Sequence, residues 1–277
     1  MPSAKPLFQA AGAADLPRIR QLLADGADPN ATWHHYAPLH TLTGPSAHRL
    51  CHPTPEALAC IEALLDAGAD PHVKGGFPPT SVMMLAAFSG AAAVIELLRA
   101  RKVKEDPYLP AAEGKLRRYS PTEPDRYGLF ALQYVAGSRL PAPGKTKVAA
   151  RLLDAGADPN VETLAGTHKV TPIYLAGNAH NLEIFALLLR HGADPNRALT
   201  VAAWSAKPFE PYAQLAMDHG AVPDLATADN EPLLNHLVHW GRLSPARWLL
   251  ARGANPNLPD ANGLTALDRA KSRGVRL

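Results

Sequence analysis

Residues 152–160 read LLDAGADPN, and close copies of this stretch return along the chain. LLADGADPN begins at residue 22, LLDAGADPH at 64, LLRHGADPN at 188 and LLARGANPN at 249, and degraded copies begin at 97 (LLRARKVKE) and 216 (AMDHGAVPD). Successive copies therefore start 42, 33, 55, 36, 28 and 33 residues apart. A period near 33 residues, with insertions and one deletion, is typical of a repeat architecture.

A second phrase precedes most copies: APLHTL at 37, SVMMLAA at 81, TPIYLAG at 171, RALTVAA at 197 and EPLLNHL at 231. Degenerate forms are KPLFQAA at 5, FALQYVA at 130 and TALDRAK at 265. Together the two phrases resemble the ankyrin repeat over about residues 5 to 274. The resemblance implies an all-α solenoid of about seven helix-turn-helix repeats plus a C-terminal half repeat, which forms a single domain over 1–277.

The residue types in both phrases have physical roles that fit short helices. Thr171 can cap a helix N-terminus, and Pro172 suits the first helical turn because its missing N–H costs nothing there. The leucine pair at 188–189 predicts the buried face of a second helix. Gly192 stands where a left-handed residue ends that helix, and the Asp-Pro-Asn that follows turns the chain. The copy at residue 97 lacks this glycine.

Composition excludes several classes of protein. The chain has 277 residues, 47% of them hydrophobic, which excludes wholesale disorder. A net charge of +3 is too small to indicate a nucleic-acid binder by itself. Two cysteines cannot form a disulfide framework, and no apolar run suggests a leader or a membrane span. We therefore expect a cytoplasmic protein, with export by a dedicated secretion system left open, and the alanine-rich composition favours a bacterial source.

Two insertions interrupt the repeats, near 44–55 and 105–125. The 105–125 insertion is rich in proline, basic and aromatic residues, so it is either a finger that grips a partner or a tolerated surface loop. The other insertion lies among six histidines and both cysteines, where His48, Cys51, His52 and Cys60 form a series of zinc-compatible ligands. Its spacing matches no familiar zinc site, and Cys60 more simply faces the core, so we predict no metal and no cofactor.

The resemblance implies partner binding through outward loops and the inner, concave face of the first helices. Aromatic and arginine side chains at those positions are typical of interface hot spots. The predicted partner-binding residues are Trp33, His34, His35, Tyr36, Phe88, Tyr108, Arg117, Arg118, Tyr119, Trp204, His239 and Trp240. Trp248, in contrast, is expected in the core.

These observations predict a non-catalytic module that binds one specific protein. The sequence has no catalytic motif of a hydrolase, phosphate-binding enzyme or metalloprotease, and no small-molecule substrate or membrane is expected. Two finer interpretations stay open: an immunity or antitoxin-type inhibitor of a cognate toxin, and a translocated effector that binds a host protein. Nucleic-acid binding through the basic segment 99–126 is a further, less favoured alternative.

Overall fold

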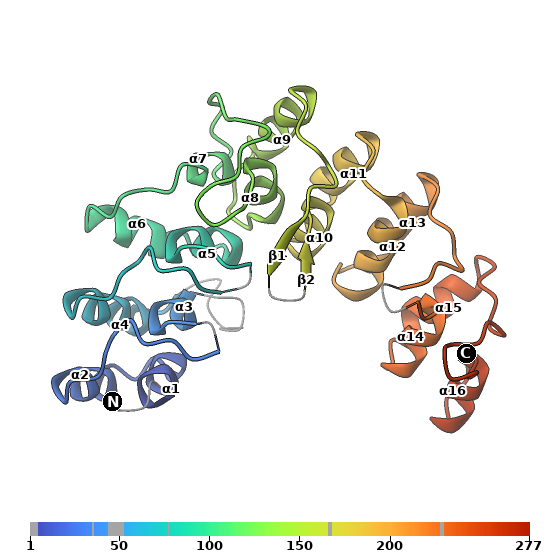
Figure 1. The fold of residues 1–277 in the computed structure, drawn as a ribbon, viewed down its shortest axis with the longest axis horizontal. Helices are drawn as coiled ribbons and strands as arrows, with labels where there is room; N and C mark the ends of the chain where they lie inside the picture. Colours follow the sequence, from blue (N-terminus) through green and yellow to red (C-terminus); the bar gives the residue numbers. More distant parts are fainter. Residues whose placement is uncertain (1–4, 35, 44–52, 77, 166–167, 228–229) are drawn as a thin grey trace. The chain divides into compact units, whose positions relative to one another are not determined.

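The computed structural model describes residues 5–34, 36–43, 53–76, 78–165, 168–227 and 230–277. By its internal contacts the chain divides into two compact units, Met1–Pro172 (unit 1) and Ile173–Leu277 (unit 2). Each unit is built mainly from short helices joined by loops (Figure 1). In the described ranges, no helix is both long and apolar enough to cross a membrane.

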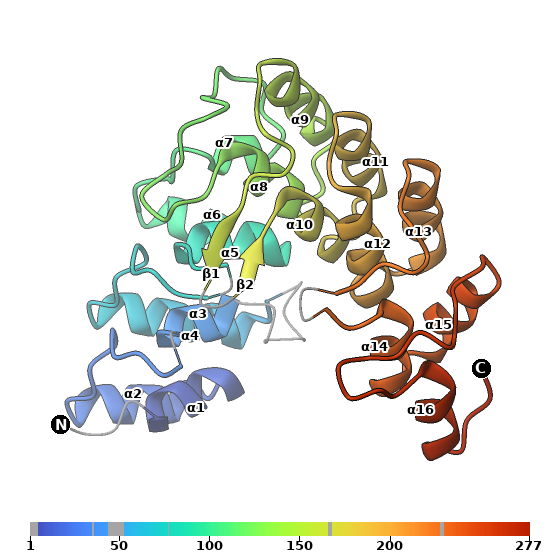
Figure 2. The same ribbon diagram turned by 45° about the vertical axis from the view of Figure 1, so that its right-hand side comes forward.

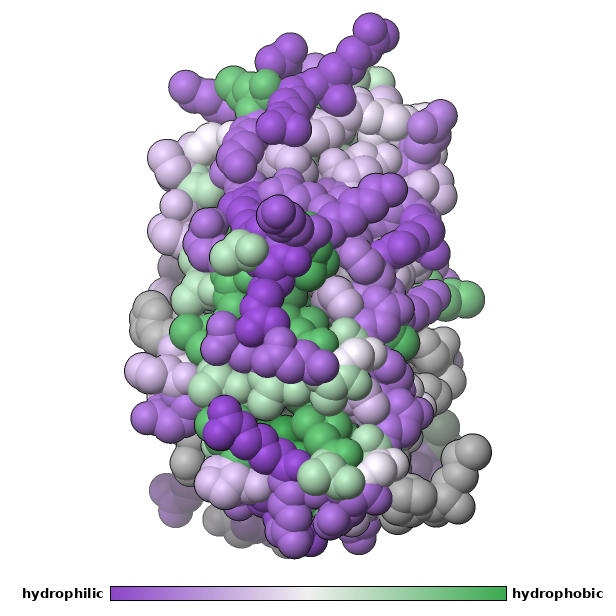
Figure 3. All heavy atoms as spheres, turned by 90° about the vertical axis from the view of Figure 1, so that its left-hand side faces the viewer, coloured by the Kyte–Doolittle hydropathy of each residue, from purple (hydrophilic) through white to green (hydrophobic). Residues whose placement is uncertain are grey.

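Unit 1 is a series of helices that pack on their neighbours in the chain and on the helix two places further on. Thus α1 packs on α2 and α3, α2 on α4, α3 on α5, and α8 on α9. The helices are α1 (Lys5–Ala13), α2 (Leu16–Ala24), α3 (Pro38–Thr43), α4 (Pro55–Asp66), α5 (Val82–Ser89), α6 (Ala92–Ala100), α7 (Leu109–Ala112), α8 (Ala131–Gly137) and α9 (Lys145–Asp154). On the face drawn in Figure 3, hydrophilic side chains predominate, with hydrophobic ones in narrow patches between them.

Unit 2 repeats the same local arrangement. Here α12 packs on α13, α13 on α11, and α14 on both α15 and α16, and the helices lie close together in both ribbon views (Figure 2). The helices are α10 (Pro172–Asn178), α11 (Leu182–Arg190), α12 (Pro195–Trp204), α13 (Phe209–Asp218), α14 (Leu233–His239), α15 (Leu243–Leu250) and α16 (Ala266–Ser272).

The expected helical character is confirmed, with one addition that the repeat pattern did not predict. Strands β1 (Thr163–Ala165) and β2 (His168–Val170) form an antiparallel pair in unit 1. Gln133 of α8 donates a hydrogen bond to the carbonyl of Val170 (2.9 Å), and the Thr163 hydroxyl donates one to Gly128 (2.8 Å). These bonds join the strand pair to α8 and its preceding loop, so the description "all-α" needs this correction.

The helix ends follow the predicted glycine rule. Gly156 has φ of +93°, and the N–H of Ala157 bonds back to the carbonyl of Leu152 (2.9 Å). A left-handed residue followed by such a backward bond satisfies carbonyls that the helix end leaves free. At the copy without glycine, Lys102 itself takes φ of +57°. A side chain in this region costs roughly 1–2 kcal/mol, so this turn is the strained member of the set.

Asparagines in the turns join successive repeats. Asn30 donates a hydrogen bond from Nδ2 to the carbonyl of Gly68 (3.0 Å) and accepts one at Oδ1 from the N–H of Asp70 (2.7 Å). In unit 2 the Asn196 side chain accepts the N–H of Val222 (2.9 Å). One turn is thereby fixed to the corresponding turn of the next helix pair.

The 105–125 segment was expected to be an outward loop, and the structure places part of it in the packed interior. It contains α7, whose residues are all buried and which packs against α5, α8 and α9. Tyr108 donates a hydrogen bond to the carbonyl of Glu123 (2.7 Å), which ties the two ends of the segment together. This insertion is therefore an additional short helix with a loop that follows it.

A buried carboxylate anchors the start of that segment. Asp106 is buried and accepts a 2.5 Å hydrogen bond from the Ser81 hydroxyl at the N-cap of α5. Its other oxygen lies 3.9 Å from Arg126. Burial raises the pKa of Asp106 above its usual range, against the smaller opposite effects of Ser81 and Arg126.

We expect Lys102→Gly to stabilise unit 1 by about 0.5–1 kcal/mol, because glycine removes the cost of the left-handed side chain while adding some unfolded-state entropy. The measurement is urea unfolding followed by circular dichroism. Lys104→Gly is the matched control, since Lys104 is also exposed but is not in the left-handed region. If the two variants are equally stable, the strain assigned to Lys102 is wrong.

The buried carboxyl gives a pH-dependent prediction. Because the folded-state pKa of Asp106 is raised, its contribution to stability is full below the ordinary value of 3.8 and is lost as the pH rises through the raised value. Asp106→Asn cannot titrate. The unfolding free energy of the wild type should therefore fall relative to Asp106→Asn as the pH rises from 3.8 through the raised pKa, as measured by urea unfolding at several pH values. A difference that is constant with pH would contradict this assignment.

Candidate partner-binding surfaces

Three of the predicted binding residues, Trp204, His239 and Trp240, meet on unit 2 with His236, which was not predicted. We call these four rings the tryptophan cluster; His239 and Trp240 are exposed, and the other two rings are half-buried. Trp204 ends α12, the two histidines lie on α14, and Trp240 caps α14. Ring centres are 5.2 Å apart for Trp204 and His236, and 5.3 Å apart for His239 and Trp240. Trp240 is 62% exposed. The cluster thus offers a large aromatic side chain to solvent beside rings that are held in place.

Charged groups fix the two imidazoles of the cluster. His236 Nδ1 lies 2.6 Å from Glu231 Oε2, and Arg269 lies 3.0 Å from the other oxygen of Glu231. Arg269 also pairs with Asp260 and donates to Nδ1 of His239 (2.5 Å). One arginine therefore links the supports of both rings, and the cluster needs little rearrangement to dock a partner.

Arg242 holds the position of Trp204. It donates from Nη2 to the carbonyls of Ala203 (2.8 Å) and Trp204 (3.0 Å) at the end of α12. Its guanidinium carbon lies 5.7 Å from the centre of the Trp204 ring, which is a cation–π distance. Trp204 is half-buried as a result, so Trp240 is the more accessible of the two tryptophans.

The predicted residues near Trp33 form a turn in unit 1. Trp33 and Tyr36 exchange two backbone hydrogen bonds of 2.8 and 3.0 Å, and both side chains are half-buried. His34 is exposed, with its ring centre 4.9 Å from that of Trp33, and Lys5 Nζ lies 5.6 Å from the Trp33 ring centre. His35 lies outside the described residues. Binding by this turn stays a prediction.

The expected exposure is wrong for Phe88 and Tyr108. Phe88 is 7% exposed and stacks on Tyr134 with ring centres 5.5 Å apart, and Tyr108 is 8% exposed. The physical reason is that α7 and α8 both pack on α5, which carries Phe88, while Tyr108 directly precedes α7. Trp248, which we expected in the core, is buried.

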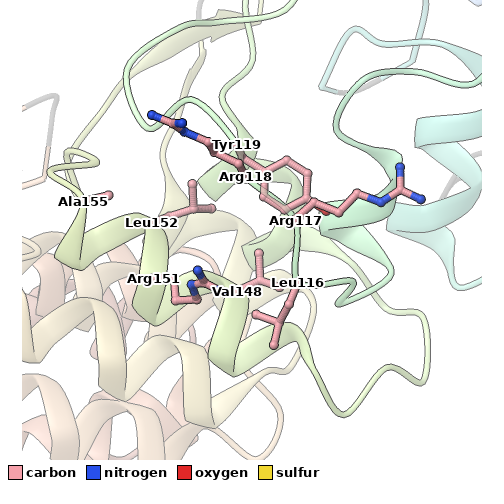
Figure 4. A pocket seen from close by; sticks show the side chains of 8 residues that line it. All are labelled: Leu116, Arg117, Arg118, Tyr119, Val148, Arg151, Leu152 and Ala155. Carbon is pink, nitrogen blue, oxygen red and sulfur yellow. The ribbon is translucent and has the colours of Figure 1, made fainter.

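The remaining predicted residues, Arg117, Arg118 and Tyr119, border a cavity of about 120 Å³ against α9 (Figure 4). We call it the arginine cavity, and its lining is Leu116, Arg117, Arg118, Tyr119, Val148, Arg151, Leu152 and Ala155. The α9 residues were missed by sequence reasoning, as were His236 and Arg242. No local signal identifies them, because each acquires its role from a segment distant in the chain.

The described ranges also bear on the proposed zinc series and on the turn aspartates. Within them, no three His, Cys, Asp or Glu side chains come together as a metal ion would require. Of the proposed zinc series, Cys60 is buried on α4, while His48, Cys51 and His52 lie outside the described residues. The turn aspartates bond the backbone, as predicted: Asp158, for example, accepts the N–H of Asn160 (2.8 Å).

Comparison with known families gives one result. Residues 168–199 match the family model of the ankyrin repeat. This range begins at β2, contains α10 and α11, and ends within α12. No curated protein matches the chain significantly.

We expect Arg242→Ala to lower the unfolding free energy of unit 2 by about 1–3 kcal/mol, because two charge-assisted hydrogen bonds to the end of α12 are lost. Urea unfolding followed by tryptophan fluorescence measures this. The control is Arg190→Ala on α11. Arg190 is exposed, and its side chain forms no hydrogen bond or ion pair among the described residues. Equal stability of the two variants would show that Arg242 does not hold Trp204.

Proposed function

Since the chain contains an ankyrin repeat, we propose that it is a protein-binding module and that the tryptophan cluster is one of its contact surfaces. Ankyrin repeats generally bind other proteins and are typically non-catalytic, and we extend both properties to this chain. The observation that carries the proposal is Trp240, an aromatic side chain that is 62% exposed beside imidazole rings that hydrogen-bond to Glu231 and Arg269.

The energetics of interfaces support this assignment. Tryptophan is enriched among residues whose truncation costs more than about 2 kcal/mol of binding energy. Burying Trp240 under a partner would remove apolar surface from water. Each Å² of apolar surface buried stabilises the complex by about 25 cal/mol. His239 and Arg269 beside it offer polar groups at the edge of the patch, where interfaces are usually more polar.

We further propose that the helix pairs are the repeats counted in the sequence, about seven with a C-terminal half repeat, in a single ankyrin-repeat domain over 1–277. Each of six helix pairs closes on the same left-handed turn, which supports a common origin of their geometry. These turns are at Gly26, Gly68, Gly156, Gly192, Gly220 and Gly253. Trp33, His34, His35 and Tyr36 are proposed as a second contact surface.

The proposal is tested by capture of binding proteins on the immobilised chain, compared between the wild type and Trp240→Ala by quantitative mass spectrometry. We expect a small set of proteins to be enriched on the wild type and reduced at least about fivefold on Trp240→Ala, since an interface tryptophan commonly contributes more than 1 kcal/mol. The identity of the captured protein, a toxin or a host protein for example, then separates the finer roles.

Leu164→Ser is the matched control, because Leu164 is an exposed apolar side chain (69%) on the β1 strand. It should retain the captured proteins. If the wild type enriches nothing above an empty resin, the chain is not a protein-binding module under these conditions and the proposal fails. If Trp240→Ala retains its proteins as Leu164→Ser does, the tryptophan cluster is not the contact surface.

A further inference from the structure

We propose that the arginine cavity of unit 1 binds an acidic segment of a partner polypeptide in which an apolar side chain is flanked by carboxylates. This inference rests on the proposed function, because it presupposes a protein partner. It deepens that function by giving the chemistry of the partner and by adding a further surface, on a different unit from the tryptophan cluster.

Three uncompensated positive charges surround the cavity. Among the described residues, the side chains of Arg117, Arg118 and Arg151 form no hydrogen bond or ion pair. In contrast, nearby Arg99 lies within 2.7–2.9 Å of three glutamates, and Arg101 pairs with Asp66 (2.5 Å). Arginines that share a small site without carboxylates form a patch to which a ligand with negative charge is electrostatically complementary.

The floor of the cavity is apolar. Val148 and Leu152 of α9 are buried, and Leu116, which lies next to Val148 in Figure 4, is 50% exposed. Such a lining gains free energy when an apolar side chain replaces water on it. A volume of about 120 Å³ suits one such side chain. The floor is therefore complementary to an apolar side chain, and the arginines at the rim are complementary to carboxylates.

The arrangement of the arginines sets the order of these groups in the ligand. In Figure 4 the guanidinium groups of Arg117 and Arg118 extend in opposite directions from the region of Tyr119, and Arg151 lies beside Val148. Cations on different sides of an apolar floor match carboxylates on both sides of a central apolar residue. Tyr119 donates a hydrogen bond to the carbonyl of Lys115 (2.6 Å), which fixes the turn that carries the two arginines.

The same charges favour a polypeptide over a nucleic acid. Four of the basic residues in the 99–126 segment lie near carboxylates of this chain, which leaves no long run of free cations for a phosphate backbone. They are Arg99, Arg101, Lys115 and Arg126. Glu96 and Glu105, which are exposed, add negative charge to this region. Of the four basic residues of this segment that form no such pair with a described residue, Arg117 and Arg118 line the cavity, and Lys102 and Lys104 lie outside its lining.

The probe is a fluorescein-labelled peptide, EEELEEE, titrated with the full chain and followed by fluorescence anisotropy. We expect it to bind more tightly than QQQLQQQ, which lacks the charges, and than EEESEEE, which lacks the apolar side chain. Arg118→Ala combined with Arg151→Ala should weaken binding of EEELEEE by about five- to tenfold. Added salt should weaken binding to the wild type as well.

Arg190→Ala on α11 is the matched control and should bind EEELEEE as the wild type does. If the double alanine variant does not fold, Arg118→Gln with Arg151→Gln takes its place and tests the same charges. The inference is overturned if EEELEEE binds no better than QQQLQQQ or EEESEEE, or if the double variant binds it unchanged. It is also overturned if single-stranded oligothymidylate binds more tightly than EEELEEE and loses that binding in the double variant.

The two proposals fail separately. If EEELEEE does not bind while the immobilised chain still captures proteins through Trp240, the arginine cavity has no ligand of this class and the protein-binding function stands. If no protein is captured by the wild type, the proposed function itself fails, whatever the peptide does.

Discussion

The backward hydrogen bond at the end of each second helix is the constraint on which the structure depends. In the copy that opened the sequence analysis, the N–H of Ala157 reaches the carbonyl of Leu152 across left-handed Gly156. The reversal satisfies carbonyls that the helix end leaves free. Within unit 1, α1 packs on α3 and α2 packs on α4, so the direction in which the chain leaves α2 decides whether the next pair can pack there.

Much of the helical framework could be predicted from the sequence, because the turn and the buried leucines are local and recur with a period. Gly192 and the leucines before it lie as the pattern requires. The additional helix α7 was not predicted, because its residues follow no complete repeat phrase and its packing partners are other helices, α5, α8 and α9. The β1–β2 pair was not predicted for a similar reason, since a hydrogen bond that holds it comes from Gln133 on α8.

For the candidate surfaces, the sequence predicted which residue types contribute, but it did not predict which residues lie beside one another. Exposed Trp240 was among the predicted residues, but its neighbours in the tryptophan cluster depend on Glu231 and Arg269, which no motif connects. Phe88 was predicted to lie on the inner, concave face of a first helix, but it is buried, because α7 of the 105–125 insertion packs on α5. Repeats specify the backbone well, and departures from the repeat decide which side chains reach solvent.

The packing of the 105–125 segment has a consequence for how unit 1 could be shortened. Tyr108 lies within 6.1 Å of the Tyr134 ring centre, and Asp125 accepts a 2.7 Å hydrogen bond from the Tyr134 hydroxyl. Excising the segment would remove Tyr108 from beside Tyr134 and would take the Asp125 acceptor away from the Tyr134 hydroxyl, leaving it the Thr80 hydroxyl at 3.0 Å. It would also remove Asp106, to which the Ser81 hydroxyl now donates. A trimmed chain with idealised repeat spacing would therefore need a redesigned core before it could fold as this one does.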